Sequence, residues 1–430
     1  MEAYILKIMN VLLIGNGARE HAIAWKLRQS NLLSKLYVAP GNAGTNKIAV
    51  NVKIDVSNFE TISTFIIDNN INLLIVGPEV PLVAGVVDFL SEKEKHKSLL
   101  IIGPDKESAQ LEGSKNFAKE FMQKYNIPTA RYFTATENNF DEALAFLKSL
   151  KAPYVLKADG LAAGKGVVIL DNISDAISEL KNILSGKFGN AGSKIVIEEF
   201  LHGIECSVFV LCDGQNFLLL PEAKDYKQVN EGNKGLNTGG MGAISPVPFF
   251  NDELKSKILS KVIIPTMEGI KTEKFNYKGF IFFGLMISDN EPYVIEYNVR
   301  MGDPETEVVF PRIKSDVLDL FIACAKKQLS TKSIEIYDEC CATVVLASKG
   351  YPEHYESGKK INGLENNDDM IFHAGTKSDG ENILSNGGRV LAVSAKATDL
   401  KAALKKSYSI INTIDFENKY YRKDIGFEFL

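Results

Sequence analysis

The stretch Tyr154–Leu170 constrains the fold more than any other part of the chain. Short apolar runs rich in Val and Ile stand at both of its ends, which predicts two strands. Lys157 closes the first run, and Lys165 stands in the loop between them. The loop also carries three glycines, Gly160, Gly164 and Gly166. Glycines let a backbone approach an anion closely, and the lysines add positive charge, so the pattern predicts a mobile hairpin over a polyphosphate.

A solvated hairpin is the alternative interpretation, because lysines beside glycines are often plain surface groups. The length and composition of the loop are unusual for a simple turn, which favours the phosphate-binding interpretation. The stretch is not a Walker A loop. Lys165 is followed by Gly166 rather than by Ser or Thr, and a strand rather than a helix comes next.

Composition excludes several classes of protein. The 430 residues carry a formal net charge of −5, which argues against a nucleic-acid-binding surface. No apolar run approaches the roughly 20 residues needed to cross a bilayer, and the first residues lack the features of a signal peptide. The five cysteines have no metal-binding spacing. We therefore expect a cytoplasmic protein with reduced cysteines and without nucleic-acid or membrane partners.

Apolar runs alternate with helical patterns in the first hundred residues. Four runs are continuously apolar: 11–14, 36–39, 73–76 and 99–102. Such runs are typical of strands in a parallel, doubly wound sheet, whose ligands bind at the carboxyl ends of the strands. The first turn, Gly15–His21, is similar to a dinucleotide fingerprint, but Glu20 stands at the third glycine position. A dinucleotide and a smaller phosphate-bearing ligand at the following helix both remain open.

A long, polar, glycine-rich segment runs from Lys224 to Gly242. A loop of this length inside a compact domain is usually either functional or disordered. Its glycines and mixed charges favour a substrate-binding loop, with disorder as the alternative.

The run from Ile295 to Arg300 alternates strictly between apolar and polar residues. Residues two apart on a strand share a face, so Glu296, Asn298 and Arg300 project together. Carboxylate and amide oxygens suit a Mg²⁺ ion that bridges phosphates, and an arginine beside them suits a carboxylate or a migrating phosphoryl group. The alternative is the solvent-facing side of an amphipathic strand.

These features together resemble the ATP-grasp enzymes, and more narrowly the phosphoribosylamine–glycine ligase (glycinamide ribonucleotide synthetase) family. The resemblance runs from about Met9 to the C-terminus. The matching segments are Gly15–His21, Gly77–Leu82, Leu111–Lys115, Lys157–Gly166, Asn237–Gly242 and Arg300–Thr306. One departure lies in the glycine-rich segment, where Tyr226 stands at a position at which the family pattern has histidine.

The resemblance implies an α/β and α+β multidomain fold. A doubly wound parallel-sheet domain is expected at residues 1–108. An ATP-grasp body is expected at 109–128 and 195–330, with a lid inserted at 129–194. A small α+β domain is expected at 331–430.

The resemblance also implies roles for individual residues. The expected ATP-binding residues are Lys115, Lys157, Gly160, Gly164, Lys165, Gly166, Glu198, Glu199, Phe200, Leu201 and Glu205. The residues expected to bind substrate are Asn16, Gly17, Glu79, Asp225, Asn237, Gly239 and Gly240. Of these, Asn16, Gly17, Glu79 and Asp225 would help to hold phosphoribosylamine. Glu296 and Asn298 would bind Mg²⁺ or Mn²⁺, and Arg300 would be catalytic, stabilising an acyl phosphate.

The activity implied is an ATP-dependent, ADP-forming ligation of glycine to 5-phosphoribosylamine through glycyl phosphate, in purine biosynthesis. Another ATP-grasp carboxylate–amine ligase, or a carboxylase of a purine intermediate, is the nearer alternative. A dinucleotide-binding oxidoreductase or sensor built on the N-terminal sheet is the more distant one, and Glu20 argues against it. We expect a monomer, with a dimer as the alternative.

Overall fold

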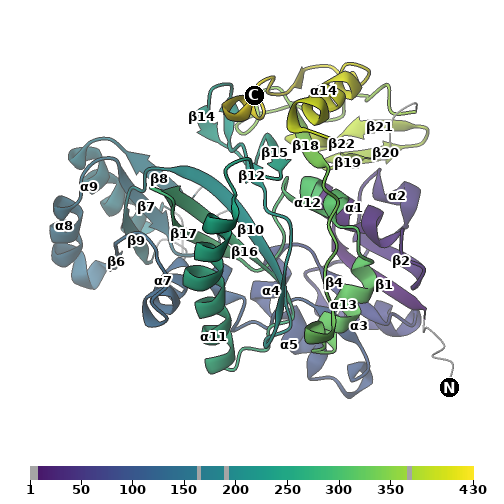
Figure 1. The fold of residues 1–430 in the computed structure, drawn as a ribbon, viewed down its shortest axis with the longest axis horizontal. Helices are drawn as coiled ribbons and strands as arrows, with labels where there is room; N and C mark the ends of the chain where they lie inside the picture. Colours follow the sequence, from purple (N-terminus) through teal and green to yellow (C-terminus); the bar gives the residue numbers. More distant parts are fainter. Residues whose placement is uncertain (1–7, 162–165, 188–192, 366–369) are drawn as a thin grey trace.

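The computed structural model describes residues 8–161, 166–187, 193–365 and 370–430 (Figure 1). The chain begins with a five-stranded parallel sheet in the order β3-β2-β1-β4-β5, which confirms the predicted doubly wound unit. Its strands are β1 (Met9–Gly15), β2 (Leu33–Pro40), β3 (Val50–Asn51), β4 (Leu73–Val76) and β5 (Leu100–Ile102). Its helices are α1 (Ala18–Leu27), α2 (Thr45–Ile48), α3 (Phe59–Asp68), α4 (Glu79–Ala84) and α5 (Val86–Ser91).

The strand order of this sheet reverses between β1 and β4. In open α/β sheets the ligand crevice lies outside the carboxyl ends of the strands at such a switch point. The turn Asn16–Gly17 follows β1, and Glu79 begins the helix that follows β4. The topology therefore brings together two parts of the predicted amine-substrate site.

Two antiparallel sheets of four strands form the middle of the molecule. One has the order β11-β10-β16-β17, and the other has the order β6-β9-β7-β8. The first comprises β10 (Ile204–Cys212), β11 (Phe217–Leu219), β16 (Gly279–Ser288) and β17 (Glu291–Asn298). The second comprises β6 (Tyr132–Ala135), β7 (Tyr154–Ala158), β8 (Val167–Leu170) and β9 (Ile195–Glu199). A tight turn at Asp289–Asn290 joins β16 to β17, and both turn residues have positive φ (50° and 61°).

Helices α8 (Phe140–Ser149) and α9 (Ile173–Asn182) cover the sheet of β6 to β9 and enclose a small core with it. Figure 1 shows this unit projecting from one side of the molecule. Strand β9, which begins the second part of the predicted body, pairs with β6 and β7. The limits of the lid and of the other units stay predictions.

The segment that begins near Leu111 forms two helices. Helix α6 (Gln110–Gly113) ends at Ser114, whose hydroxyl accepts from the backbone N–H of Phe117 and caps α7 (Lys115–Lys124). Lys115 therefore stands at the first position of a helix, as predicted. The remaining helices of the middle region are α10 (Asp252–Ile258), α11 (Ile264–Thr272), α12 (Thr306–Arg312) and α13 (Val317–Ala325).

The C-terminal part is built on a six-stranded sheet that also takes in both ends of the glycine-rich segment 224–242. Its strands are β12 (Lys224–Asp225), β15 (Gly242–Ser245), β18 (Cys340–Ser348), β19 (Ile371–His373), β22 (Arg389–Ala397) and β23 (Lys419–Tyr420). Helix α14 (Leu400–Ile411) packs on β18 and β22, and β20 (Thr376–Asp379) pairs with β21 (Asn382–Ser385). Within the segment, β13 (Gln228–Asn230) and β14 (Lys234–Asn237) form a hairpin, so the alternative of disorder is wrong.

The apolar cores join the units to one another. Leu12 and Ile14 of the first sheet belong to the same core as Val208 and Phe283 of the middle sheet. Ala18 and Ala22 of α1 pack with Phe372 of the C-terminal sheet. Among the described residues, no helix combines the length and the apolarity that crossing a membrane requires.

Candidate active site

A buried group of two lysines and one glutamate lies beneath the glycine hairpin. Lys157 on β7 places Nζ 2.9 Å from Glu198 Oε2, and Lys119 on α7 places Nζ 3.2 Å from Glu198 Oε1. Burial alone disfavours the Glu198 carboxylate, but the two lysines outweigh it and hold its pKa below the usual value. The predicted ATP residues Lys157 and Glu198 thus contact each other. Lys119 escaped the sequence prediction, although it lies one helical turn after Lys115.

Lys115 ties the start of α7 to the first strand of the hairpin. Its Nζ donates to the carbonyl oxygens of Ala158 (2.9 Å) and Gly160 (3.2 Å). Asp159 accepts from Ser114 Oγ (2.9 Å) and from the backbone N–H of Asn116 (2.7 Å). The hairpin therefore leaves the body at a point fixed by several hydrogen bonds.

The second side of the hairpin is described only from Gly166 onward. The carbonyl oxygen of Gly166 accepts from the backbone N–H of Ala158 (2.8 Å), which closes the base of the hairpin. Gly164 and Lys165 lie outside the described residues, so their predicted contact with phosphates stays a prediction.

The end of β9 and the segment after it carry three further residues that were predicted to bind ATP. The Glu199 carboxylate contacts Arg131, with Nε 3.0 Å from Oε2, instead of joining the buried group at Glu198. Phe200 stacks edge-on against His202, with ring centroids 4.9 Å apart. Phe200 and Leu201 belong to the short segment that connects β9 of one middle sheet to β10 of the other.

Glu205, predicted near the ribose, pairs with a lysine of the glycine-rich segment. Lys227 Nζ lies 2.7 Å from Glu205 Oε2. Burial lowers the pKa of Lys227, but Glu205, Asp225 and Glu296 outweigh it and raise the pKa well above the usual value. Burial raises the pKa of Asp225, against the pull of Lys227. Glu205, Asp225 and Glu296, which were predicted to bind nucleotide, amine substrate and metal, therefore all act on the charge of Lys227.

The predicted metal ligands lie at the end of β17. Tyr297 and Val299 are buried in the core (2% and 1% exposed), which leaves Glu296 and Asn298 on the opposite face, as the alternation predicts. The pairing with β16 skips Ile295, because Glu296 faces Gly284 and Val294 faces the next residue, Leu285. A bulge of this kind re-aims the side chains that follow it.

The donor set at this position fits a divalent cation. The Glu296 carboxylate makes no hydrogen bond or ion pair with any described residue, although its charge acts on Lys115 and Lys227. The buried Asn298 Nδ2 has no hydrogen-bond partner among the described residues. The described residues contain no cluster of three or more His, Cys, Asp or Glu suited to a metal. Two hard oxygen donors that leave other positions to phosphate and water are what Mg²⁺ commonly takes from a protein.

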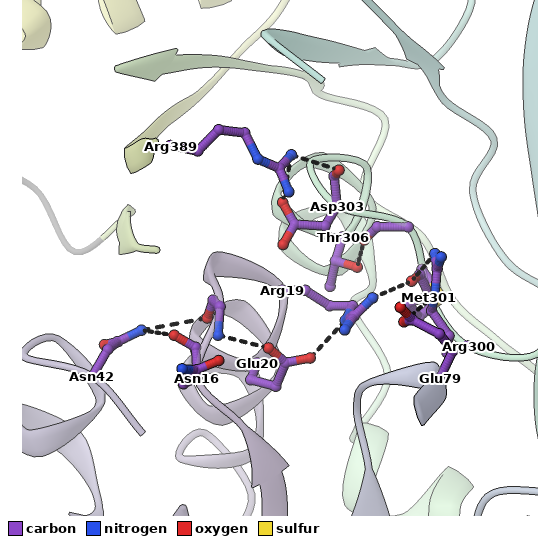
Figure 2. A network of polar contacts seen from close by, with 12 residues as sticks. Asn16, Arg19, Glu20, Asn42, Glu79, Arg300, Met301, Asp303, Thr306 and Arg389 are labelled. Carbon is purple, nitrogen blue, oxygen red and sulfur yellow. Dashed lines mark hydrogen bonds and ion pairs between the residues drawn. The ribbon is translucent and has the colours of Figure 1, made fainter. Parts of the chain in front are cut away.

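Arg300 lies two residues beyond the end of β17, so the predicted strand is too long at this end. Its Nε lies 3.3 Å from Glu79 Oε2, and its NH1 donates to the Met301 carbonyl (3.2 Å) (Figure 2). Its NH2 lies 2.8 Å from Glu112 Oε1. Glu112 also accepts from the backbone N–H of Val299 (2.8 Å). Glu79, predicted to hold the amine substrate, thus helps to orient the predicted catalytic arginine.

The first glycine turn is joined to the Arg300 segment through Arg19. Glu20 accepts from the Gly17 backbone N–H (2.8 Å) and from Arg19 Nε (2.6 Å), and Arg19 NH1 donates to the Met301 carbonyl (3.2 Å). Figure 2 shows Arg19 and Arg300 converging on that carbonyl. The Glu20 carboxylate thus takes the helix N-terminus that a dinucleotide would use, which argues further against the oxidoreductase alternative. The Asn16 carbonyl accepts from Asn42 Nδ2 (2.9 Å).

The glycines of the substrate loop contact the C-terminal sheet. Arg389 NH1 donates to the Gly239 carbonyl (2.7 Å), and the Gly239 N–H donates to Tyr351 Oη (3.0 Å). Gly240 has φ +116°, and a Cβ there would lie 2.3 Å from Pro304 Cδ, so only glycine fits. Asn237 is exposed and bonds to Gln228, apart from the buried groups.

Arg389 also reaches the segment that follows Arg300. It pairs with Asp303 Oδ1 (3.0 Å) and donates to the Asp303 carbonyl (2.8 Å) (Figure 2). Among the residues of these networks that were not predicted as site residues are Arg19, Glu112, Tyr351 and Arg389. Arg19 and Glu112 stand inside recognised segments, Gly15–His21 and Leu111–Lys115, so the signal was present for them. Tyr351 and Arg389 stand in no such segment.

Three family models match consecutive parts of the chain. The phosphoribosylglycinamide synthetase N domain matches residues 9–112, the ATP-grasp (A) domain of that enzyme matches 113–306, and its C domain matches 341–428. Biotin carboxylase from Campylobacter jejuni shares the fold, with a TM-score of 0.72 at 15% identity over 97% of this chain and 94% of that one.

Relatives of high coverage agree with these models. A phosphoribosylamine–glycine ligase of Clostridium acetobutylicum is 46% identical over 97% of this chain and 99% of its own length. One from Fusobacterium nucleatum is 44% identical over 97% of this chain and 98% of its own. The crystal structure of the Thermotoga maritima phosphoribosylamine–glycine ligase superposes with a TM-score of 0.84 at 35% identity, over 96% of this chain and 99% of that one. The chain therefore belongs to the phosphoribosylamine–glycine ligase family.

Proposed function

We propose that this chain joins glycine to 5-phosphoribosylamine at the expense of ATP, giving N1-(5-phosphoribosyl)glycinamide, ADP and phosphate in purine biosynthesis. The observation that carries the proposal is the 46% identity to a ligase of that name over 99% of the relative's length. The likeness to biotin carboxylase concerns the fold alone at 15% identity and does not favour the carboxylase alternative.

The reaction has two chemical steps. A glycine carboxylate oxygen attacks the γ-phosphorus of ATP, the bond to ADP breaks, and glycyl phosphate forms. The amine of 5-phosphoribosylamine then attacks the acyl carbon, the C–N bond forms, phosphate leaves with its bonding pair, and the amine loses a proton. Both steps concentrate negative charge on phosphoryl oxygens, so positioned cations lower their barriers.

Lys115, Lys157 and the hairpin from Gly160 to Gly166 would hold the ATP phosphates. Lys157 and Lys119 share the single carboxylate of Glu198, so the buried group keeps one excess positive charge beneath the hairpin. Phosphates arriving there are neutralised without the protein having to recruit a cation at the moment of transfer.

Glu296 and Asn298 would hold a divalent ion, for which Mg²⁺ is the best fit and Mn²⁺ the alternative. When bound, the ion neutralises phosphoryl oxygens. The Glu296 carboxylate is the main support, because it has no hydrogen-bond or ion-pair partner among the described residues, and carboxylates that are shielded from water usually have one.

Arg300 would contact the acyl phosphate. A guanidinium has five N–H donors, and the contacts with Glu79, Glu112 and Met301 engage three of its nitrogens with one acceptor each. Two of the five N–H donors of Arg300 have no acceptor among the described residues, so they could bind a substrate oxygen. Asn16 and Gly17 at the switch point, with Asp225, Gly239 and Gly240, would surround the amine substrate.

The remaining proposals concern the setting of the enzyme. Its partners would be the small molecules ATP, glycine and 5-phosphoribosylamine, and we propose a cytoplasmic monomer. All five cysteines are free, and four of them are buried, which suits a reducing compartment.

Release of ADP tests the proposed function. The purified chain with Mg²⁺ and ATP should release ADP only when glycine and 5-phosphoribosylamine are both present, and glycinamide ribonucleotide should form in equal amount. Replacing glycine by bicarbonate tests the carboxylase alternative in the same assay. Release that needs bicarbonate, or that ignores the amine, would contradict the proposal.

A further inference from the structure

The hairpin of β13 and β14 projects from the substrate loop with little support of its own. All its residues from Asn230 to Asn237 are exposed except the half-buried Asn233. A two-stranded hairpin is at best marginally stable in water, so contacts from elsewhere must set its position. Figure 1 shows β14 beside the end of the chain.

The C-terminal segment, residues 419–430, supplies such contacts. Three of its side chains bond to backbone groups of the hairpin, which fixes the ribbon itself rather than mobile side chains. Tyr420 Oη donates to Val229 O (2.7 Å), Arg422 NH1 donates to Gln228 O (3.1 Å), and Gly232 N–H donates to Asp424 Oδ2 (2.7 Å).

Arg422 is the centre of this contact. It is completely buried, and Nε and NH2 each lie 2.8 Å from an oxygen of Asp424. NH1 also donates to Asn233 Oδ1 (3.1 Å), and the guanidinium carbon lies 5.3 Å from the centre of the Tyr226 ring. A forked pair combined with a stacked ring is a geometry that lysine does not reproduce.

Tyr226 connects this contact to the base of the hairpin. It is 1% exposed, and its hydroxyl donates to Glu428 Oε2 (3.2 Å), while Asn233 Nδ2 donates to Glu428 Oε1 (3.0 Å). The tyrosine at the point where this chain departs from the family pattern therefore packs beneath Arg422.

The next residue, Lys227, links the base of the hairpin to the candidate site. Its carbonyl accepts from Thr238 N–H (2.8 Å) and from Thr238 Oγ1 (2.7 Å), which closes the base of the hairpin. Its Nζ lies 2.7 Å from Glu205 Oε2. A shift of the hairpin base would therefore move an ammonium group among the acidic side chains of the site.

We propose that Arg422 is a positioning residue for the ligase reaction, fixing the hairpin so that Lys227 and Asp225 stand correctly at the substrate site. The inference rests on the proposed function for the identity of the reaction. The nucleotide-side residues Lys115, Lys157 and Glu198 stand on other elements and should be little affected, whereas Glu205, also predicted to bind ATP, pairs with Lys227.

The test compares Arg422→Met and Arg422→Lys with wild type in kcat, in KM for each substrate, in ADP affinity by calorimetry, and in amide exchange of residues 228–237. Arg422→Met should raise KM for glycine or phosphoribosylamine about tenfold, the loss of one charged hydrogen bond. ADP affinity should change less than this KM, because Glu205 is the predicted ATP residue that pairs with Lys227, and amide exchange in the hairpin should quicken. Arg422→Lys should restore only part of the loss.

Milder variants decide the matter if Arg422→Met does not fold. Tyr420→Phe and Asn233→Ala remove contacts from the exposed ribbon and should raise the same KM roughly threefold each. Asn233→Ala should add little to an Arg422 variant, because the two residues act through one contact. Lys396→Met is the matched control, since it removes an ion pair with Glu339 and a contact with the Tyr337 ring in the same sheet.

Three outcomes separate this proposal from its rivals. Unchanged KM values with a lowered melting temperature would show a merely structural role and overturn it. Equal losses in Lys396→Met and in the hairpin variants would also overturn it. Wild-type enzyme that releases no ADP with both substrates would overturn the proposed function and this proposal together, whereas normal wild-type turnover isolates the role of Arg422.

Discussion

Two ion triads with opposite composition lie in the candidate site. The group beneath the glycine hairpin places two lysines, Lys119 and Lys157, around one carboxylate, and all three side chains are at most 7% exposed. The group at the switch point places one arginine, Arg300, between the carboxylates of Glu79 and Glu112, and it is more open to solvent. The first carries one excess positive charge and the second one excess negative charge.

The opposite net charges of the two triads indicate different roles in the reaction. An excess positive charge in a dry setting attracts phosphates strongly, because charges interact more strongly where water is excluded. In the second triad, Glu79 and Glu112 offset the charge of Arg300. The main effect of these two carboxylates is therefore to orient the guanidinium group. We therefore expect the first triad to govern nucleotide binding and turnover together, and the second to govern turnover.

Lys157→Met should give the largest effect. It removes the excess charge of the first triad and leaves Glu198 paired with Lys119 alone. We expect ADP release to fall roughly 10²–10³-fold, with weaker nucleotide binding, because a preorganised cation is lost at the phosphates. Steady-state kinetics with calorimetric ADP binding checks this. Near-normal nucleotide affinity in the folded variant would mean that the phosphates bind elsewhere.

Arg300→Ala should lower turnover next most strongly, by about 10² or more in kcat, while ADP affinity falls far less. The change leaves Glu79 and Glu112 without their cation, so the melting temperature should fall as well. Lys314→Ala, which removes an exposed pair with Glu335, is the control for simple loss of a cation. Equal losses of turnover and nucleotide affinity would remove the distinction between the triads.

The first triad should also respond to pH. Burial lowers the pKa of Lys119 from 10.5 to about 8, so the unfolded chain binds more protons than the folded one between these values. Stability from this group should therefore rise as pH rises from about 8 to 10.5 and be lost as pH falls through about 8. Deprotonation also cancels the excess charge, so ADP should bind severalfold more weakly above pH 8. Comparing wild type with Lys119→Met across pH 7–9.5 checks both effects, and identical profiles would contradict them.

The sequence predicted elements well where the pattern is local. Period-two alternation placed Glu296 and Asn298 opposite the buried Tyr297 and Val299, because strand geometry alone decides which face a residue takes. Continuous apolar runs predicted four strands of the first sheet, but not β3, whose two residues are too few for any pattern. The bulge at Ile295 escaped as well, since it depends on the pairing with β16.

Contacts between distant segments escaped prediction for a different reason. Glu112 and Val299 are 187 positions apart, and Arg389 and Gly239 are 150 apart. Their meeting depends on how three sheets pack, which no single stretch encodes. The roles of individual site residues rest on the family resemblance and stay predictions. The structure adds which of those residues contact one another.

The neighbours Glu198 and Glu199 offer the smallest and sharpest test of the first triad. Both were predicted to bind ATP, but adjacent residues on a strand point to opposite faces, and the carboxylate of Glu199 contacts the largely exposed Arg131. Glu199→Ala should therefore change turnover and ADP affinity less than about twofold, because exposed ion pairs contribute at most about 1 kcal/mol. Glu198→Ala should cost far more, since it leaves two buried lysines facing each other without a carboxylate. Parallel measurement of ADP release and thermal unfolding in the two variants checks the contrast. A large loss for Glu199→Ala would show that the nucleotide reaches beyond the buried triad to the outer face of β9.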